Sequence, residues 1–219
     1  MRTGQTQALP PRPAVADPVP LVWKTGGRTP ATGFAPSILD DLQALLDTRS
    51  ADVMLFPGGA NAAWEAAVAA TLSPGDRVLV VRTGQVAADW ALMAGRIGLE
   101  VEVIDRPWGA PAPVAEIARR LGADRYGAIK AVFVAQSDPA ISDLAGLRRA
   151  IDTAFHDALL FVDGSGVRGS GAVRMDACCI DAAVSESHPG LACAPGLGIL
   201  GLSALALAAK PAALRPVAV

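Results

Sequence analysis

The sequence predicts an α/β fold, a three-layer α/β/α sandwich in which helices cover both faces of a mostly parallel β-sheet. Short apolar runs of strand character alternate along the chain with helical segments of ten or more residues, which is the pattern of βαβ units. Several of these runs are continuous, as in RVLVV, and continuous runs are typical of strands buried on both faces. The 219 residues, 52% of them hydrophobic, suffice for one sizeable core.

The first predicted helix spans residues 35–50, where apolar side chains recur at helical spacing. A short apolar strand follows and ends in the glycine turn PGGAN at 57–61. The alanine-rich segment 60–72 is a predicted helix, because alanine is the strongest helix former, and the turn residues SPGD end it.

The same alternation continues as far as residue 186. The later predicted strands are 77–84, 99–105, 128–136, 158–164 and 180–186, and the later predicted helices are 87–98, 112–123 and 143–155. In open parallel sheets, ligands bind beyond the carboxyl ends of the strands. The residues at those ends are therefore the first candidates for a functional site.

Composition argues against several classes of partner and site. The chain has 19 basic and 21 acidic residues with no basic run, so we expect no nucleic-acid partner and no membrane association. The three cysteines show neither disulfide nor zinc-ligand spacing.

Residues 1–22 are rich in proline and are expected to form a disordered arm, and residues 23–219 are expected to form the folded domain. The start of the chain lacks the apolar core of a secretory signal, so we expect a cytoplasmic protein.

The glycine turn is a candidate anion site. Gly58, Gly59, Ala60 and Asn61 precede a predicted helix, so backbone N–H groups and the helix N-terminus could together hold a phosphate. The turn lacks both the G-x-G-x-x-G pattern and the P-loop pattern. A tight turn that needs small residues for steric reasons is the alternative interpretation.

Asp163 is the second candidate site residue. It follows five apolar residues at the end of a predicted strand, and a carboxylate buried there needs a cation, a set of donors or a protonated ring nitrogen. Arg168 and Arg174 are candidate partners. The alternative is an aspartate that caps a helix or braces a loop.

The order and spacing of several segments resemble a known family. They are FPGGANAAWEAAVAATLSPGDRVLVVRTGQ, GLEVEVIDRPWG, IKAVFV, ALLFVDGSG and RMDACCIDAAVSESHPGLACAPGLGIL. From about Gly27 to Ala209 the chain resembles the large domain of class V aminotransferases. The nearest branch is that of serine–glyoxylate and alanine–glyoxylate aminotransferases, pyridoxal-phosphate enzymes of fold type I.

The resemblance gives each candidate residue an expected role. Gly58 to Asn61 align with the turn that binds the cofactor phosphate, although the hydroxyl residues usual there are missing. Asp163 matches the aspartate that keeps the pyridine nitrogen protonated. Thr83 falls where this branch has an aromatic residue stacked on the ring, so a contact worth on the order of 1 kcal/mol is lost.

The segment SESHPG departs most from the family. There the family reads Gly-Ser-Gln-Lys-Gly, and the lysine is covalently attached to the cofactor; the alignment places His188 at the glutamine and Pro189 at the lysine. Proline has no amine for attachment or proton transfer, and general acid–base catalysis alone contributes about 10² to 10⁴ in rate. The chain's three lysines, Lys24, Lys130 and Lys210, are not expected to substitute.

Three functional interpretations follow from the resemblance. The first is a catalytically impaired relative, a pseudoenzyme that lacks the small C-terminal domain and forms a homo- or hetero-dimer with an aminotransferase-like chain as its partner or regulatory subunit. Pyridoxal phosphate would bind it non-covalently or not at all. The second is a transaminase, passing an amino group to a glyoxylate-type acceptor, whose lysine a partner chain supplies. The third is a decaying gene product without a selected function.

Overall fold

The computed structural model describes residues 23–24, 36–137, 142–166, 173–188, 191 and 193–209. The strands are β1 (Trp23–Lys24), β2 (Asp52–Pro57), β3 (Arg77–Arg82), β4 (Glu100–Asp105), β5 (Ile129–Ser137), β6 (Leu159–Gly166), β7 (Ala182–Glu186) and β8 (Leu197–Leu202). The helices are α1 (Pro36–Leu45), α2 (Gly59–Thr71), α3 (Gln85–Arg96), α4 (Val114–Ala123), α5 (Leu144–Thr153) and α6 (Ala204–Ala208). The predicted arm at 1–22 lies outside the described residues.

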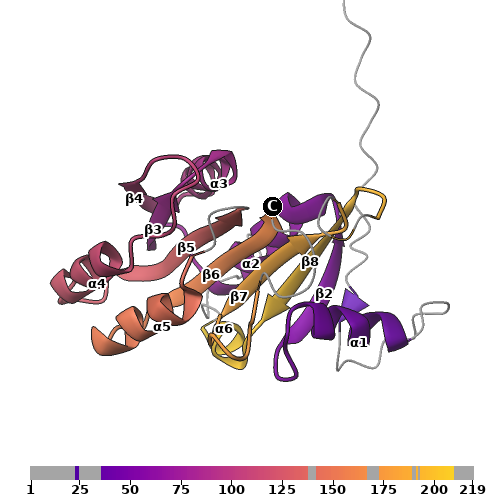
Figure 1. Cartoon of the computed structure of the whole chain (residues 1–219). Coiled ribbons are helices and arrows are strands. Elements are labelled where there is room, and N and C mark those ends of the chain that lie inside the picture. Colours follow the sequence, from indigo (N-terminus) through magenta and orange to yellow (C-terminus); the bar gives the residue numbers. More distant parts are fainter. Residues whose placement is uncertain are drawn as a thin grey trace, which may run out of the picture.

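The described strands form one sheet in the order β1-β2-β8-β7-β6-β5-β3-β4 (Figure 1). Strands β2 to β7 run in one direction, whereas β1 and β8 are antiparallel to their neighbours. Both β2 and β6 therefore bring their carboxyl ends to the same edge of the sheet. The prediction of a mostly parallel sheet is confirmed.

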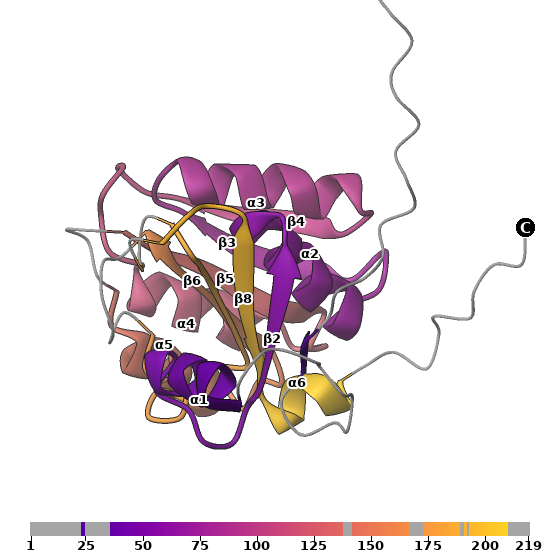
Figure 2. The same ribbon diagram turned by 90° about the vertical axis from the view of Figure 1, so that its right-hand side faces the viewer.

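Helices cover both faces of this sheet, which Figure 2 shows with α2 and α3 on one side and α1, α4 and α5 on the other. Strand side chains alternate between two cores, so that Val132 and Val134 pack with α4 and α5, and Ala131 and Phe133 pack with α2 and α3. The three-layer sandwich is thus confirmed. None of the described helices is long and apolar enough to cross a membrane.

An aromatic cluster anchors α2 and α3 to the sheet. Trp64 lies 5.0 Å from Trp90 and 5.3 Å from Phe133 between ring centroids, and Phe133 lies 5.0 Å from Phe161. All four side chains are almost fully buried. Because Phe161 precedes Asp163 by two residues on β6, the cluster forms an apolar floor beneath the end of that strand.

Three described elements were missed from the sequence, namely β1, β8 and α6. β8 lies in a glycine-rich segment whose apolar residues recur neither every two residues, as in a strand, nor every 3.6 residues, as in a helix. Its glycines avoid clashes with neighbouring side chains. A Cβ at Gly201 would stand 2.8 Å from the Met175 sulfur and 2.9 Å from a Leu46 methyl carbon. Because close neighbours require glycine at this position, β8 lacks the regular hydrophobic pattern by which the other strands were predicted.

Candidate functional site

The carboxyl edge of the sheet brings four segments together. The turn between β2 and α2 adjoins the start of β8, because Pro57 pairs with Leu197. On the other side of β8, Glu186 at the end of β7 pairs with Gly198, and Val184 pairs with Asp163 of β6. The glycine turn and Asp163, predicted separately from the sequence, therefore belong to one edge of the molecule.

Asp163 is a buried carboxylate with one unused oxygen. The residue is only 1% exposed, its Oδ1 accepts a 2.7 Å hydrogen bond from the Ser165 N–H, and its Oδ2 has no partner among the described residues. Burial raises the pKa of Asp163 to about 6, the bonds to Ser165 oppose that rise, and the charge of Glu186 adds to it. One oxygen braces the loop and the other is available to a donor.

Arg174, one of the two arginines predicted as partners of Asp163, lies elsewhere. Arg174 Nε lies 3.9 Å from Asp47 Oδ2, and its side chain is 64% exposed, so that prediction was wrong. Arg168 lies outside the described residues.

The glycine turn begins α2 with left-handed backbone. Gly58 and Gly59 have φ angles of 114° and 75°, which favour glycine. The Gly58 N–H donates to the Gly196 carbonyl at 2.8 Å, and the Ala60 N–H donates to Glu186 Oε2 at 3.2 Å. A carboxylate of the chain itself therefore occupies the position at this helix N-terminus where an external anion would bind. Asn61 is exposed.

Thr83 and His188 are the other two predicted cofactor contacts among the described residues. Thr83 is buried after β3, and β3 is two strands from β6, which places it about 10 Å to the side of Asp163. His188 is exposed. Pro189, at the predicted lysine position, lies outside the described residues.

Two residues of this edge were missed from the sequence. Ser187 is buried and braces the loop, because its Oγ donates to the Ala194 carbonyl at 2.7 Å and accepts from the Leu197 N–H at 3.3 Å. Glu186 contacts α2, as described above. The signal for Glu186 was present, since it immediately precedes Ser187 and stands where the family motif Gly-Ser-Gln-Lys-Gly begins with glycine.

The lysine that the structure describes in full lies far from this edge. Lys130 Nζ donates to the Gly127 carbonyl at 2.7 Å at the amino end of β5. Ala135 pairs with Asp163 and is five residues further along the strand, which corresponds to about 16 Å. Lys24 lies in β1, and its side chain is not among the described parts; Lys210 lies outside the described residues.

The edge fits pyridoxal phosphate only in part. The unpartnered Oδ2 of Asp163, over an aromatic floor, suits a protonated ring nitrogen. The helix N-terminus does not suit the phosphate, because the Glu186 carboxylate already accepts from Ala60 and would stand 3.2 Å from a Cβ built on Gly59. The ring position fits the cofactor, and the phosphate position does not.

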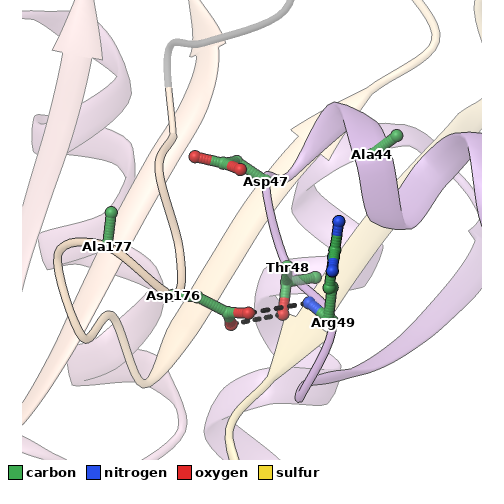
Figure 3. Close-up of a pocket in the computed structure, with 6 residues that line it drawn as sticks. All are labelled: Ala44, Asp47, Thr48, Arg49, Asp176 and Ala177. Atoms are coloured by element: carbon green, nitrogen blue, oxygen red, sulfur yellow. Dashed lines mark hydrogen bonds between the residues drawn. The ribbon is translucent and has the colours of Figure 1, made fainter.

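A separate cavity of about 580 Å³ lies at the opposite edge of the sheet, before the amino ends of β2 and β7 (Figure 3). Its lining residues are Ala44, Asp47, Thr48, Arg49, Asp176 and Ala177. Asp176 accepts from Thr48 Oγ1, the Arg49 N–H and Ser50 Oγ at 2.6, 2.7 and 2.9 Å. Burial acts to raise the pKa of Asp176, but these hydrogen bonds outweigh it and the pKa is lowered. The carboxylate is fully employed in joining two loops, so this cavity is not a catalytic candidate.

Gly198→Ala is expected to lower the free energy of unfolding by about 1–3 kcal/mol, the usual cost of overpacking. A Cβ at Gly198 would overlap the carbonyl oxygen of Gly59 and touch the Ala63 methyl group, and backbone cannot yield as a side chain does. Urea denaturation followed by tryptophan fluorescence measures the change. Gly122→Ala in α4 is the control, because its Cβ would meet nothing within 4 Å and helix propensity favours alanine. Equal stabilities for the two variants would contradict this account of the turn.

Comparison with known proteins gives a consistent result. The family model described as "Aminotransferase class-V" matches residues 34–214. Over 177 residues the chain is 42% identical to the serine–glyoxylate aminotransferase of Hyphomicrobium methylovorum, covering 80% of this chain and 44% of that protein. Over 181 residues it is 40% identical to the L-aspartate–glyoxylate aminotransferase of Paracoccus denitrificans, covering 81% and 46%.

Among solved structures, the fold resembles an alanine–glyoxylate aminotransferase from Nostoc sp. with a TM-score of 0.68 at 29% identity. That match covers 79% of this chain and 46% of the other. The chain therefore spans less than half the length of these three relatives.

Proposed function

The chain belongs to the class V aminotransferase family, and we propose that it is a non-catalytic member that holds a pyridine-type ring without covalent attachment. The observation that carries the proposal is the free carboxylate oxygen of the buried Asp163. Lys130, in contrast, lies at the far end of the neighbouring strand. The anchor for the ring nitrogen is retained, and the described residues offer no amine beside it.

Asp163 favours a cationic ring for a simple reason. Its carboxylate has lost its water, and one of its two oxygens is without a donor among the described residues. A protonated ring nitrogen would supply both the missing hydrogen bond and the opposite charge. When bound in this family, the cofactor supplies an electron sink. The proline at the aligned lysine position leaves this chain with no amine there for covalent attachment or proton transfer.

The test combines binding with chemical trapping. Pyridoxal and pyridoxal phosphate are titrated separately into the wild-type protein and into Asp163→Asn, followed by borohydride reduction and peptide mapping. We expect saturable spectral changes with at least one ligand, a loss of at least tenfold in affinity in Asp163→Asn, and no stoichiometric adduct on any lysine. A stoichiometric adduct on Lys24, Lys130 or Lys210 would overturn the non-catalytic assignment. Equal binding by both proteins would overturn the role of Asp163.

The oligomeric and cellular setting belongs to the same proposal. We take the functional form to be a dimer with an identical or related aminotransferase-like chain, located in the cytoplasm. The same free oxygen of Asp163 also supports an alternative, in which a partner chain supplies the lysine and the pair transaminates a glyoxylate-type acceptor. Trapping in a mixture with the partner distinguishes the two, because the alternative predicts an adduct on the partner's peptide.

A further inference from the structure

Glu186 links the end of a strand to the start of a helix. It closes β7, and its Oε2 accepts the hydrogen bond of the Ala60 N–H at the start of α2, across 126 residues of sequence. We propose that Glu186 is a built-in anion that fills this helix N-terminus, so that the site selects rings without a phosphate over phosphorylated ones. The identity of the ring rests on the function proposed above, whereas the exclusion of phosphate does not.

The carboxylate fills the space that a phosphate would need. A Cβ added to Gly59 would already stand 3.2 Å from Glu186 Oε2, so the oxygen is in close contact with the glycine turn. The neighbouring Gly58 N–H is also engaged, by the Gly196 carbonyl at 2.8 Å. A phosphate could reach these N–H groups only by displacing groups of the chain itself.

The backbone holds Glu186 in this position. Its strand partner is Gly198, where the absence of a side chain lets the Gly59 carbonyl approach closely. The next residue, Ser187, is tied to Leu197 by backbone and side-chain hydrogen bonds. The backbone on either side of Glu186 is thus fixed, and the side chain has a short, defined path to the start of α2.

Charge works in the same direction as space. Val184 and Phe161 belong to one core, and Glu186 and Asp163 each lie two residues further along adjacent strands. The two carboxylates therefore share a face of the sheet as diagonal neighbours, at about 8 Å. No described lysine or arginine forms an ion pair with either residue. A phosphate monoester, which carries about −1.5 to −2 charges, would face two carboxylates, whereas a cationic ring would be attracted by both.

The test compares ligands that cannot react with lysines. Pyridoxine and pyridoxine 5′-phosphate lack the aldehyde, and their fluorescence is titrated with wild-type protein, Glu186→Gln and the control Glu65→Gln. The glutamine keeps an oxygen that can accept from Ala60, removes the negative charge and replaces the other oxygen by an NH2 group. Glu65 lies on the exposed side of the same helix, so its variant makes the same charge change away from the site.

We expect wild-type protein and Glu65→Gln to bind pyridoxine at least tenfold more tightly than its phosphate. Glu186→Gln should gain at least tenfold for the phosphate form and change less than threefold for pyridoxine. If the phosphate form binds wild-type protein as well as pyridoxine does, and Glu186→Gln changes neither, the inference is wrong while ring binding stands.

A second experiment separates this inference from the proposed function. Thermal unfolding is measured in inorganic phosphate against chloride at equal ionic strength, for the wild-type protein, Glu186→Gln and Glu186→Ala. Phosphate should raise the Tm of the two variants by clearly more than it raises the wild-type Tm, because its general stabilising effect is common to all three proteins. If no protein binds either ring, the proposed function fails, and this experiment still decides the role of Glu186. Equal responses of all three proteins to phosphate would refute that role.

Discussion

Asp163→Asn is expected to stabilise the ligand-free protein by about 3 kcal/mol at neutral to mildly alkaline pH. The aspartate is 1% exposed, and its pKa is raised from 3.8 to about 6. One pKa unit corresponds to about 1.4 kcal/mol, so keeping this carboxylate ionised in the folded protein costs about 3 kcal/mol. Asparagine has nearly the same shape, can still accept from the Ser165 N–H and carries no charge.

The sign and the pH window follow from the raised pKa. Between about pH 4 and pH 6 the folded protein keeps a proton on Asp163 that the unfolded chain releases, so the contribution of this group to stability falls as pH rises. It is fully present below about pH 4 and lost above about pH 6. The advantage of Asp163→Asn should therefore be absent at pH 3.5 and complete at pH 7.5.

Urea denaturation at these two pH values, followed by tryptophan fluorescence, measures the effect. Asp89→Asn is the control, because Asp89 is exposed on α3 and should respond little at either pH. Equal stabilities of Asp163→Asn and the wild-type protein at pH 7.5 would contradict the account of a buried, uncompensated carboxylate. The predicted result would mean that the chain retains a destabilising group, which a bound cation could compensate.

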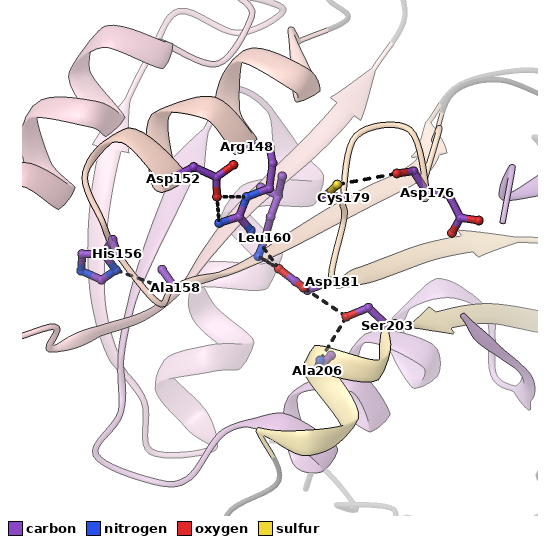
Figure 4. Close-up of polar contacts among 10 residues, drawn as sticks. All are labelled: Arg148, Asp152, His156, Ala158, Leu160, Asp176, Cys179, Asp181, Ser203 and Ala206. Atoms are coloured by element: carbon purple, nitrogen blue, oxygen red, sulfur yellow. Dashed lines mark hydrogen bonds and ion pairs between the residues drawn. The ribbon is translucent and has the colours of Figure 1, made fainter. Parts of the chain in front are cut away.

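Asp181→Ala is expected to destabilise the protein by about 3 kcal/mol. Asp181 is buried just before β7, and its Oδ2 accepts from the Leu160 N–H at 2.8 Å and from Arg148 Nη1 at 3.3 Å (Figure 4). Its Oδ1 accepts from Ser203 Oγ at 3.1 Å, before α6. Removing the carboxylate leaves these donors unpaired, and unsatisfied buried donors cost about 1–3 kcal/mol each.

Two variants make this prediction specific. Asp152 binds the same Arg148 at 2.8 Å, but its side chain is 61% exposed. Asp152→Ala should therefore cost no more than about 0.5 kcal/mol, as is usual for exposed ion pairs. Burial raises the pKa of Asp181 even against its hydrogen bonds, so its value lies in the donors that it satisfies more than in its charge. Asp181→Asn should thus cost clearly less than Asp181→Ala.

Urea denaturation of these variants beside the wild-type protein decides the matter. A loss below about 0.5 kcal/mol for Asp181→Ala, no larger than an exposed ion pair contributes, would contradict the network.

The sequence was most informative where one local property decided the structure. The parallel strands could be predicted because most of them are apolar runs bounded by turn residues, and the VLVV segment of β3, residues 78–81, is buried as the composition of a central strand requires. The glycine turn at Gly58 and Gly59 could be predicted because its left-handed backbone favours glycine, which has no Cβ. The burial of Asp163 followed from its position after five apolar residues.

Tertiary structure decided what depends on contacts between distant segments. β8 is held between β2 and β7 by close packing at glycines, which leaves no periodic signal. The contact between Glu186 and Ala60 joins residues 126 positions apart, so no local pattern could reveal it. The sequence by itself thus determined the layers of the fold and the buried acid at the site. Only the tertiary structure decided that the Glu186 carboxylate lies at the start of α2, because the position of Glu186 depends on the register of β7 against β8.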